Sequence, residues 1–351
     1  MVSTVLTEEE QEKNEKKIHN YRIEKYACQA VAKKALPNER VTICMSGVVG
    51  DRVEIWKHLK TDKTFYKGLM ICGSIWTCPV CAAKISERRR NELRAAFTQH
   101  TKQGKHVAML TLTFSHKRTD SLKTILSHFS DATSRFMSGK AFNQIRNEMS
   151  LIGRIKVYEV TYGKNGFHPH AHIALFYENE VDLESIQKRL FRLWSNACEK
   201  VGLKTNSKHG LDLQDSEHAS AYLSKHGNWS LEQELSKAHI KVAKEGSMTP
   251  FDFLRNFLDT NDEKYLKLFR EYAETFKGKR QIHWSRGLKD KFDIEEKTDE
   301  ELAKEKIELA DLLGNLSLDQ WKEIMHLDRR AQLLNNIEKY GFDAGYSITV
   351  Q

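Results

Sequence analysis

Residues 154–177 read RIKVYEVTYGKNGFHPHAHIALFY, and this stretch decides the fold that the sequence predicts. Residues 154–162 and 168–177 are rich in β-branched and aromatic residues, which is typical of strands. Between them, the segment GKNG at 163–166 has the glycine and asparagine content of a turn. We therefore expect two antiparallel strands joined as a hairpin.

Further strands and helices flank this hairpin. Apolar patterns predict strands over 106–114 and 211–213, and amphipathic helices over 121–148, 183–201 and 217–226. The order β-α-β-β-α-β predicts an α+β fold with a split βαβ antiparallel sheet and both long helices on one face. The other face of the sheet would then remain available for a ligand.

The rest of the chain differs in character from this central region. Residues 7–36 predict a charged helix, 41–44 a strand, and 251–277 a helix. We expect five parts: an N-terminal helix over 1–37, a cysteine-rich zinc module with a basic helix over 38–100, the sheet domain over 105–230, a basic and aromatic extension over 231–293, and an acidic helical tail over 294–351.

Composition excludes several classes of protein. Of the 351 residues 40% are hydrophobic, which is sufficient for a packed core and excludes a wholly disordered chain. No apolar run approaches the ~20 residues that span a bilayer, and the N-terminus is acidic and polar, so we expect neither a membrane span nor a signal peptide. The expected compartment is the cytoplasm. There the net charge of +8 permits a polyanionic partner.

His168, His170 and His172 are candidate ligands of a metal ion. Alternate residues of a strand point to the same face, so the three imidazoles would lie together. Glu159, in the preceding strand, could present a carboxylate to the same ion across the hairpin. A mixed imidazole and carboxylate set with open coordination positions suits a divalent ion that holds a phosphate oxygen. The alternative is that these are ordinary exposed strand residues.

Four of the six cysteines have the spacing of a structural zinc site. Cys78 and Cys81 form a CxxC pair, Cys72 lies just upstream, and Cys44 lies in the predicted strand. Four thiolates around a tetrahedral ion leave no open coordination position, so such a zinc stabilises the fold. Cys28 competes with Cys44 as the fourth ligand. A buried cluster of free thiols and a redox pair are the alternatives.

Tyr222, in the segment AYLSK, is a candidate nucleophile. On the predicted helix, Lys225 and His218 would share its face. A phenol attacks phosphate poorly until a cation or metal stabilises the developing charge, and Lys225 could supply that charge. The alternative is an ordinary core tyrosine.

Two basic groups are candidates for contacts with DNA. Positive charge neutralises phosphates, and an indole offers a stacking surface for unpaired bases. The alternatives are a solvated helix surface and a packed tryptophan. The residues are Arg88, Arg89, Arg90 and Arg94 beside the cysteines, and Lys279, Arg280, Trp284 and Arg286 further along the chain.

Three of these motifs occur in an order that resembles the rolling-circle replication initiators of small bacterial plasmids, which belong to the HUH endonucleases. The motifs are LTLTF at 110–114, HPHAH at 168–172, and Tyr222 with Lys225. The segments at 72–81, 249–252 and 284–289 also resemble that group. The likeness covers about residues 40 to 290 and is specific in combination.

The resemblance implies a metal-dependent, sequence-specific nickase with an HUH nuclease domain over 105–230. His170 and His172 match its paired metal histidines, with Mg²⁺ or Mn²⁺ as the expected ion. Glu159 or His168 would be the third protein ligand. Zinc remains the ion expected at the cysteines.

The resemblance also assigns the nucleophile and the partners. Tyr222 matches the residue that attacks the origin strand, forms a 5′-phosphotyrosine and frees a 3′-hydroxyl primer, and Lys225 matches the lysine that follows it. The expected partners are origin DNA, single-stranded or extruded, with a host helicase and polymerase.

One position departs from the family pattern. Some members place a glutamate four residues before the tyrosine to activate water in the terminating cleavage, whereas this chain has His218 there. Glu217 lies one residue further back and about 140° around the helix. Glu217, His218, Asp215 or a second tyrosyl event could therefore serve. A relaxase or single-strand transposase with the same chemistry, and a non-catalytic zinc-stabilised nucleic-acid-binding regulator, are the alternative functions.

Overall fold

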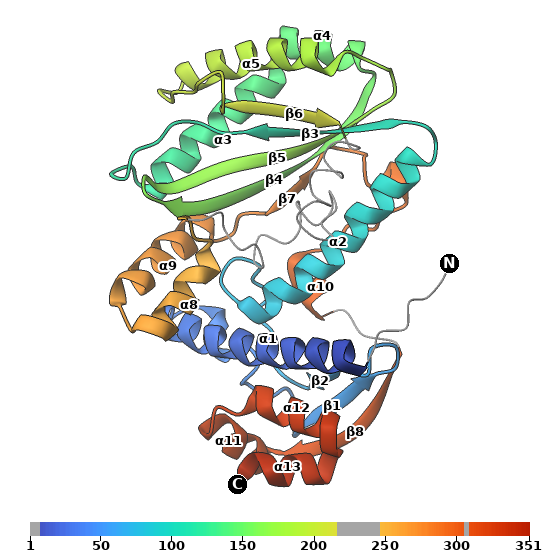
Figure 1. The fold of residues 1–351 in the computed structure, drawn as a ribbon, viewed down its shortest axis with the longest axis vertical. Coiled ribbons are helices and arrows are strands. Elements are labelled where there is room, and N and C mark those ends of the chain that lie inside the picture. Colours follow the sequence, from blue (N-terminus) through green and yellow to red (C-terminus); the bar gives the residue numbers. More distant parts are fainter. Residues whose placement is uncertain (1–7, 216–245, 305–308) are drawn as a thin grey trace. The chain divides into compact units, whose positions relative to one another are not determined.

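The computed structural model describes residues 8–215, 246–304 and 309–351. These residues form a mixed α+β structure with two antiparallel sheets and several helices (Figure 1). They fall into two units: unit 1 lies within 1–84, 254–266 and 298–351, and unit 2 within 85–253 and 267–297. The five-part division expected from the sequence stays a prediction.

Unit 2 is built on a five-stranded sheet with the strand order β6-β3-β5-β4-β7. The predicted hairpin is confirmed and lies within this sheet. It consists of β4 (Leu151–Gly163) and β5 (Gly166–Tyr177). Gly166 has φ 87°, a conformation that favours glycine and lets the chain reverse here. The remaining strands are β3 (His106–Leu112), β6 (Leu211–Asp215) and β7 (Ile282–Trp284).

Helices α3 (Leu122–Ser138), α4 (Lys140–Glu148) and α5 (Leu183–Glu199) cover one face of this sheet (Figure 1). The expectation of a single helix over 121–148 is wrong, because Gly139 adopts an extended conformation between α3 and α4. The completely buried ring of Trp194 packs edge-on against Phe129, and its Nε1 donates to the carbonyl oxygen of Thr113.

The opposite face of the sheet is partly covered, so the expectation that it stays free is wrong for this part. Helix α2 (Pro79–Thr101) belongs to unit 2 from residue 85 onward, and this part of the helix packs onto β3, β4 and β5 in one hydrophobic core. Phe97 of α2 stacks on Phe176 of β5 with ring centroids 5.3 Å apart. The apolar half of the strand is therefore buried, and His170 and His172 lie farther along the same face. The core comprises Leu93, Ala96, Phe97, Val107, Met109, Ile155, Val157, Ala174, Phe176, Leu288 and Phe292.

The aromatic segment after residue 249 forms two helices, so the single helix expected over 251–277 is wrong. They are α8 (Pro250–Thr260) and α9 (Glu263–Phe276). Between them, Asn261 has φ 53°, a left-handed conformation that ends α8. A short helical turn η2 (Asp290–Phe292) and helix α10 (Asp299–Lys304) follow.

Unit 1 combines helix α1 with a three-stranded sheet and three C-terminal helices. Helix α1 (Glu8–Ala35) confirms the charged helix predicted there. The strand order is β2-β1-β8, so β8 (Ala310–Ser317) pairs with β1 (Arg52–His58), and β2 (Thr64–Lys67) lies on the other side of β1. The sequence did not predict this pairing. The predicted C-terminal helices are confirmed as α11 (Leu318–His326), α12 (Arg330–Tyr340) and α13 (Phe342–Val350).

The strand expected over 41–44 is wrong. These residues lie in a 3₁₀ turn, η1 (Arg40–Ile43), and Cys44 follows it. The backbone N–H of Thr42 donates to Glu39 and that of Cys44 donates to Val41, so the local chain closes on itself instead of pairing with another strand.

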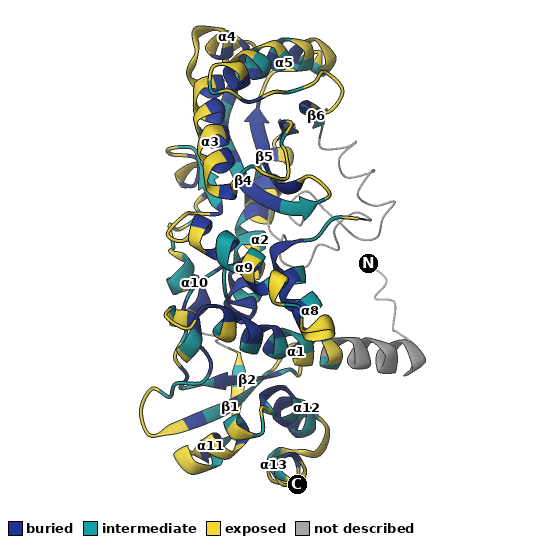
Figure 2. Cartoon of the chain, turned by 90° about the vertical axis from the view of Figure 1, so that its left-hand side faces the viewer, coloured by how far each residue is buried: buried dark blue, intermediate teal, exposed yellow. Residues whose placement is uncertain are grey.

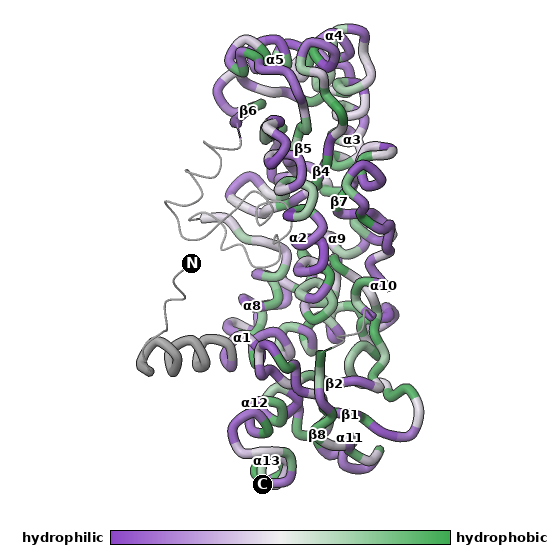
Figure 3. Tube along the Cα trace, turned by 90° about the vertical axis from the view of Figure 1, so that its right-hand side faces the viewer, coloured by the Kyte–Doolittle hydropathy of each residue, from purple (hydrophilic) through white to green (hydrophobic). Residues whose placement is uncertain are grey.

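Burial follows the hydropathy of the sequence within each unit. The central strands carry buried, apolar residues, whereas the outer sides of the helices are exposed and hydrophilic (Figures 2 and 3). Among the described residues, none of the helices has the length and apolar character needed to cross a membrane.

Candidate metal centres

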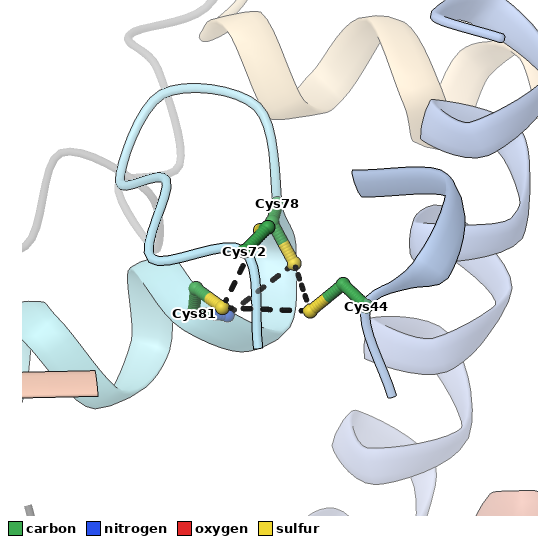
Figure 4. Close-up of side chains that lie close together, drawn as sticks. All are labelled: Cys44, Cys72, Cys78 and Cys81. Carbon is green, nitrogen blue, oxygen red and sulfur yellow. Dashed lines mark hydrogen bonds between the residues drawn. The ribbon is translucent and has the colours of Figure 1, made fainter. Parts of the chain in front are cut away.

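Four buried cysteines converge in unit 1, as the sequence predicts (Figure 4). The Sγ atoms of Cys44 and Cys78 lie 3.7 Å apart, those of Cys44 and Cys81 3.6 Å, and those of Cys72 and Cys81 3.6 Å. Sulfur ligands about 2.3 Å from a tetrahedral zinc ion are about 3.8 Å from one another. The four thiols therefore fit a zinc ion, and Cys28, the rival of Cys44, is outside the group.

Short irregular segments and a helix start bring these four side chains together. Cys44 follows the turn η1, Cys78 immediately precedes α2, and Cys81 lies in its first turn. The change from the expected strand to a 3₁₀ turn thus places Cys44 next to the CxxC pair (Figure 4).

Hydrogen bonds among the four thiols shift their pKa values in opposite directions. Burial raises the pKa of Cys78, but hydrogen bonds with Cys44, Cys72 and Cys81 outweigh it and lower the pKa well below its usual range. Hydrogen bonds with Cys44 and Cys78, together with burial, instead raise the pKa of Cys72. Four thiolates this close need a compensating positive charge, which a divalent cation supplies.

Glu159, His170 and His172 form a second group of possible metal ligands, in unit 2. Oε2 of Glu159 lies 3.1 Å from Nε2 of His170 and 3.7 Å from Nε2 of His172. Glu159 stands opposite His170 in the β4–β5 register, so the hairpin itself sets this distance. Glu159 is 4% exposed, and a carboxylate at such a site needs a cationic or hydrogen-bonding partner.

Hydrogen bonds orient both imidazoles of this group. Nδ1 of His172 lies 3.1 Å from Oγ1 of Thr111, and Nδ1 of His170 lies 3.3 Å from the carbonyl oxygen of His168. A proton on each Nδ1 satisfies these oxygens and leaves the Nε2 lone pairs directed toward Glu159. Two imidazoles and one carboxylate in this arrangement would suit a divalent cation and would leave some of its coordination positions open.

His168 lies outside this ligand group. Its ring centroid is 4.6 Å from that of His116, and its Nε2 is buried with no hydrogen-bond partner among the described residues. Burial, with the nearby charges of His170 and His116, lowers the pKa of His168 to about 3. The geometry therefore favours Glu159 over His168 as the third ligand.

The sequence analysis missed Thr111 and His116. Thr111 lies within the LTLTF motif, and its place opposite His172 follows from the pairing of β3 with β5. The motif was visible in the sequence, but the hydrogen-bond partner of the Thr111 side chain depends on which strand lies next to β3.

The proposed nucleophile and its neighbours lie outside the described residues. This holds for Tyr222, Lys225, Glu217 and His218. Asp215 is the last residue of β6 and stands opposite Ala108 of β3. Every role of these five residues remains a prediction.

The basic groups are partly engaged within unit 2. Nη1 of Arg89 lies 3.0 Å from a carboxylate oxygen of Glu92, and Arg90 pairs with Glu87. Trp284 packs against the hydrophobic core, which favours the packed alternative for this indole. The other predicted DNA contacts lie on α2 (Arg88, Arg94), before β7 (Lys279, Arg280) and after it (Arg286).

Comparisons with known proteins agree with the sequence motifs. A family described as replication protein matches residues 67–333. A curated protein named Protein rep, from Streptomyces lividans, is 27% identical over 289 residues, which cover 63% of this chain and 63% of that protein. A protein named neomycin resistance protein, from Streptomyces cyanogenus, is 28% identical over 148 residues. This match covers 35% of this chain and 34% of that protein. The chain thus spans less than two thirds of each relative's length. No solved structure matches.

Proposed function

The chain belongs to the replication protein family that matches residues 67–333, and on this premise we propose that it initiates rolling-circle replication of a plasmid by nicking one strand of the origin. The observation that carries the proposal is the group of Glu159, His170 and His172 on neighbouring strands of unit 2. The proposal assigns this sheet to the HUH type of split βαβ fold, with the paired histidines on the central strand β5.

The metal group would prepare the scissile phosphate. Glu159, His170 and His172 would hold Mg²⁺ or Mn²⁺, which supplies Lewis-acid stabilisation of charge on a phosphate oxygen. The fixed hydrogen bonds of both imidazoles keep their Nε2 atoms in place before substrate arrives, so little reorganisation is needed during the reaction.

Tyr222 would perform the nucleophilic step. Its phenolic oxygen forms a bond to the scissile phosphorus while the bond to the 3′ oxygen breaks, and the phenolic proton ends on that 3′ oxygen. The products are a 5′-phosphotyrosine and a free 3′-hydroxyl that primes synthesis. Lys225 would stabilise charge on the phosphate, and Glu217, His218 or Asp215 would serve the terminating cleavage.

Unit 1 would contribute a structural zinc rather than a catalytic one. The donor set of Cys44, Cys72, Cys78 and Cys81 fits a closed tetrahedral site, which has no position for substrate. Zinc binding would join the segment around η1 to the start of α2.

The decisive experiment uses the purified full-length protein with labelled single strands of the plasmid origin and Mg²⁺ or Mn²⁺. We expect a nicked strand and a covalent adduct that mass spectrometry locates on Tyr222. Tyr222→Phe should abolish the adduct and retain origin binding, while the control Tyr340→Phe, at an exposed position in unit 1, should keep both activities.

Other outcomes separate the alternatives. Nicking by Tyr222→Phe without an adduct would identify a hydrolase and contradict the assigned nucleophile. Binding of the origin by the wild-type protein without cleavage in either metal would instead identify a non-catalytic regulator.

A further inference from the structure

Two buried polar side chains, from distant parts of the sequence, lie beside the cysteine cluster in unit 1. Gln29 of α1 is completely buried, and its Nε2 donates to Sγ of Cys78 at 3.2 Å. Arg330, the first residue of α12, is 1% exposed. Its Nη1 donates to Oε1 of Gln29 at 2.9 Å and to the carbonyl oxygen of Met45 at 3.1 Å. A hydrogen-bonded chain thus runs from Arg330 through Gln29 to Cys78.

The charge of Arg330 is incompletely compensated by its protein neighbours. Its nearest carboxylate oxygen, from Asp328, is 3.5 Å away on a mostly exposed side chain, and its Nε is buried with no hydrogen-bond partner among the described residues. The ring of Tyr26 lies 4.8 Å from the guanidinium and adds a cation–π contact. A buried guanidinium that lacks full pairing is strongly destabilising, because it has lost its hydration.

A metal-loaded cysteine cluster would supply the missing negative charge. Four thiolates and one divalent ion carry a net charge of −2, because four negative charges exceed two positive ones. Lys25 and Lys33 lie in the same electrostatic environment: burial lowers the pKa of each to about 8, while the charge of Cys78 acts in the opposite direction. Two further basic side chains thus lie close enough to the cluster for its charge to act on their amines.

We propose that Gln29 and Arg330 are positioning residues of a metal centre at Cys44, Cys72, Cys78 and Cys81, and that metal binding there fixes the C-terminal helix α12 to α1. Gln29 donates an N–H to the thiolate of Cys78, and Arg330 both orients Gln29 and neutralises the centre. This inference rests on the proposed metal at the cysteines and is independent of the nicking chemistry.

The proposal gives the C-terminal segment a role that its sequence does not show. The hydroxyl of Tyr66, in β2, donates to the carbonyl oxygen of Arg330, so the same residue also joins the small sheet of unit 1. Without metal the four thiols would not all ionise, so Arg330 would face less negative charge, and the contact between α12 and α1 would lose part of its electrostatic basis. Metal loading and order of the C-terminal helices should therefore change together.

The test measures zinc affinity of the full-length protein by competition with a chromogenic chelator. We expect Arg330→Met to bind zinc about 10- to 100-fold more weakly, the usual effect of losing an outer-sphere partner. Arg330→Lys, which keeps the charge, should recover part of the loss. Gln29→Leu should weaken zinc binding as well.

Arg22→Met provides a matched control. Arg22 is 8% exposed and also links α1 to α12, through Asn335 and Glu338, but it makes no hydrogen bond to a cysteine. This variant should lower the stability of unit 1 and, because zinc binding is coupled to folding of this unit, weaken zinc binding clearly less than Arg330→Met does. An equal loss of affinity in Arg22→Met and Arg330→Met would show that both act through stability alone, and would overturn the inference.

A spectroscopic measurement separates positioning from general destabilisation. In the Co²⁺-substituted protein, loss of the N–H···S hydrogen bond in Gln29→Leu should shift the sulfur-to-metal charge-transfer band, and Arg22→Met should not shift it. An unchanged band in Gln29→Leu overturns the inference, even where Arg330→Met fails to fold. A wild-type protein that binds no zinc would instead reject the cysteine metal centre itself, whatever the result of the nicking assay.

Discussion

In the cysteine group of unit 1 the ligand atoms all lie within 4.8 Å of one another, and the same is true within the glutamate–histidine group of unit 2. The two groups nevertheless suit different chemistry. Four buried thiols complete a tetrahedral shell, whereas Glu159, His170 and His172 provide three ligands and leave coordination positions open. The first arrangement stabilises a fold, and the second can bind a substrate oxygen. Closeness of metal-binding side chains therefore does not by itself identify a catalytic site.

The two groups also differ in what holds them together. The ligands of unit 2 stand on β4 and β5, which share a continuous register from Gly153 to Gly163, so the sheet positions them without a metal. Cys44 and Cys72 lie outside regular helices and strands. We infer that removing metal should unfold the first region and leave the second folded but inactive.

Cys78→Ser should have the largest effect. It removes a central thiol of the cluster, and structural zinc contributes about 10–16 kcal/mol to small zinc domains. We expect release of about one zinc per chain and loss of folded structure in unit 1, measured by elemental analysis and hydrogen exchange. Cys198→Ser, at a buried cysteine of α5 outside both groups, should keep the zinc. Full zinc content in Cys78→Ser would contradict the prediction.

The double variant His170→Ala, His172→Ala should abolish cleavage without unfolding unit 2. Loss of the ion removes several kcal/mol of transition-state stabilisation, which corresponds to at least about a 1000-fold slower reaction. The measurement is nicking of origin strands in Mg²⁺ and in Mn²⁺, with thermal unfolding monitored in parallel. His128→Ala, at an exposed position of α3, is the control. Residual cleavage at the wild-type rate would show that these histidines hold no catalytic ion.

Thr111→Val should have a smaller effect on the same centre. Valine keeps the shape of the side chain but removes the oxygen that accepts from Nδ1 of His172. We expect about 10-fold weaker binding of the divalent ion, or about 1.4 kcal/mol, at the lower end of outer-sphere effects. Calorimetric titration with Mn²⁺ measures it, and Thr111→Ser should restore affinity. Equal affinities of the valine and serine variants would exclude the orienting role.

Glu338→Gln should have the smallest effect and tests an ion pair of unit 1 that makes no contact with the cysteine cluster. Burial raises the pKa of Glu338, but the hydrogen bond and charge of Arg22, the backbone N–H of Thr64 and the charge of Lys63 together outweigh it, so the net pKa is lowered. A lowered carboxyl pKa contributes stability above the ordinary value of 4.5 and loses it as the pH falls below that value. Glu338→Gln should therefore cost about 1 kcal/mol near pH 7, a cost that shrinks in acid. Urea unfolding at several pH values would show it, and a difference independent of pH would contradict it.

Local patterns predicted much of unit 2. The hairpin of β4 and β5 was predictable because alternating apolar residues and a glycine-containing turn are signals within one short stretch. That hairpin also placed Glu159 beside His170, since a short turn fixes the register of its two strands. In unit 1, the spacing of Cys72, Cys78 and Cys81 likewise indicated a metal site, because closely spaced cysteines can reach one ion.

Local propensity failed where contacts with distant residues decide the conformation. Residues 41–44 have the β-branched composition of a strand, but they form a turn that brings Cys44 to the other cysteines. The helix predicted over 121–148 is interrupted at Gly139, which is extended and lies between the end of α3 and the start of α4.

The sequence by itself determined the central hairpin and most members of the two groups of candidate metal ligands, because these depend on spacing over a few tens of residues. The choice of Cys44 over Cys28 and of Glu159 over His168 came from the structure. Only the tertiary structure decided that Thr111 orients His172, that β8 pairs with β1, and that Arg330 reaches Cys78 through Gln29. Arg330 and Gln29 are 301 positions apart, and no periodicity or turn signal extends over such a distance. Contacts of this kind follow from how helices and strands pack, since burial of apolar surface, not sequence spacing, selects their neighbours.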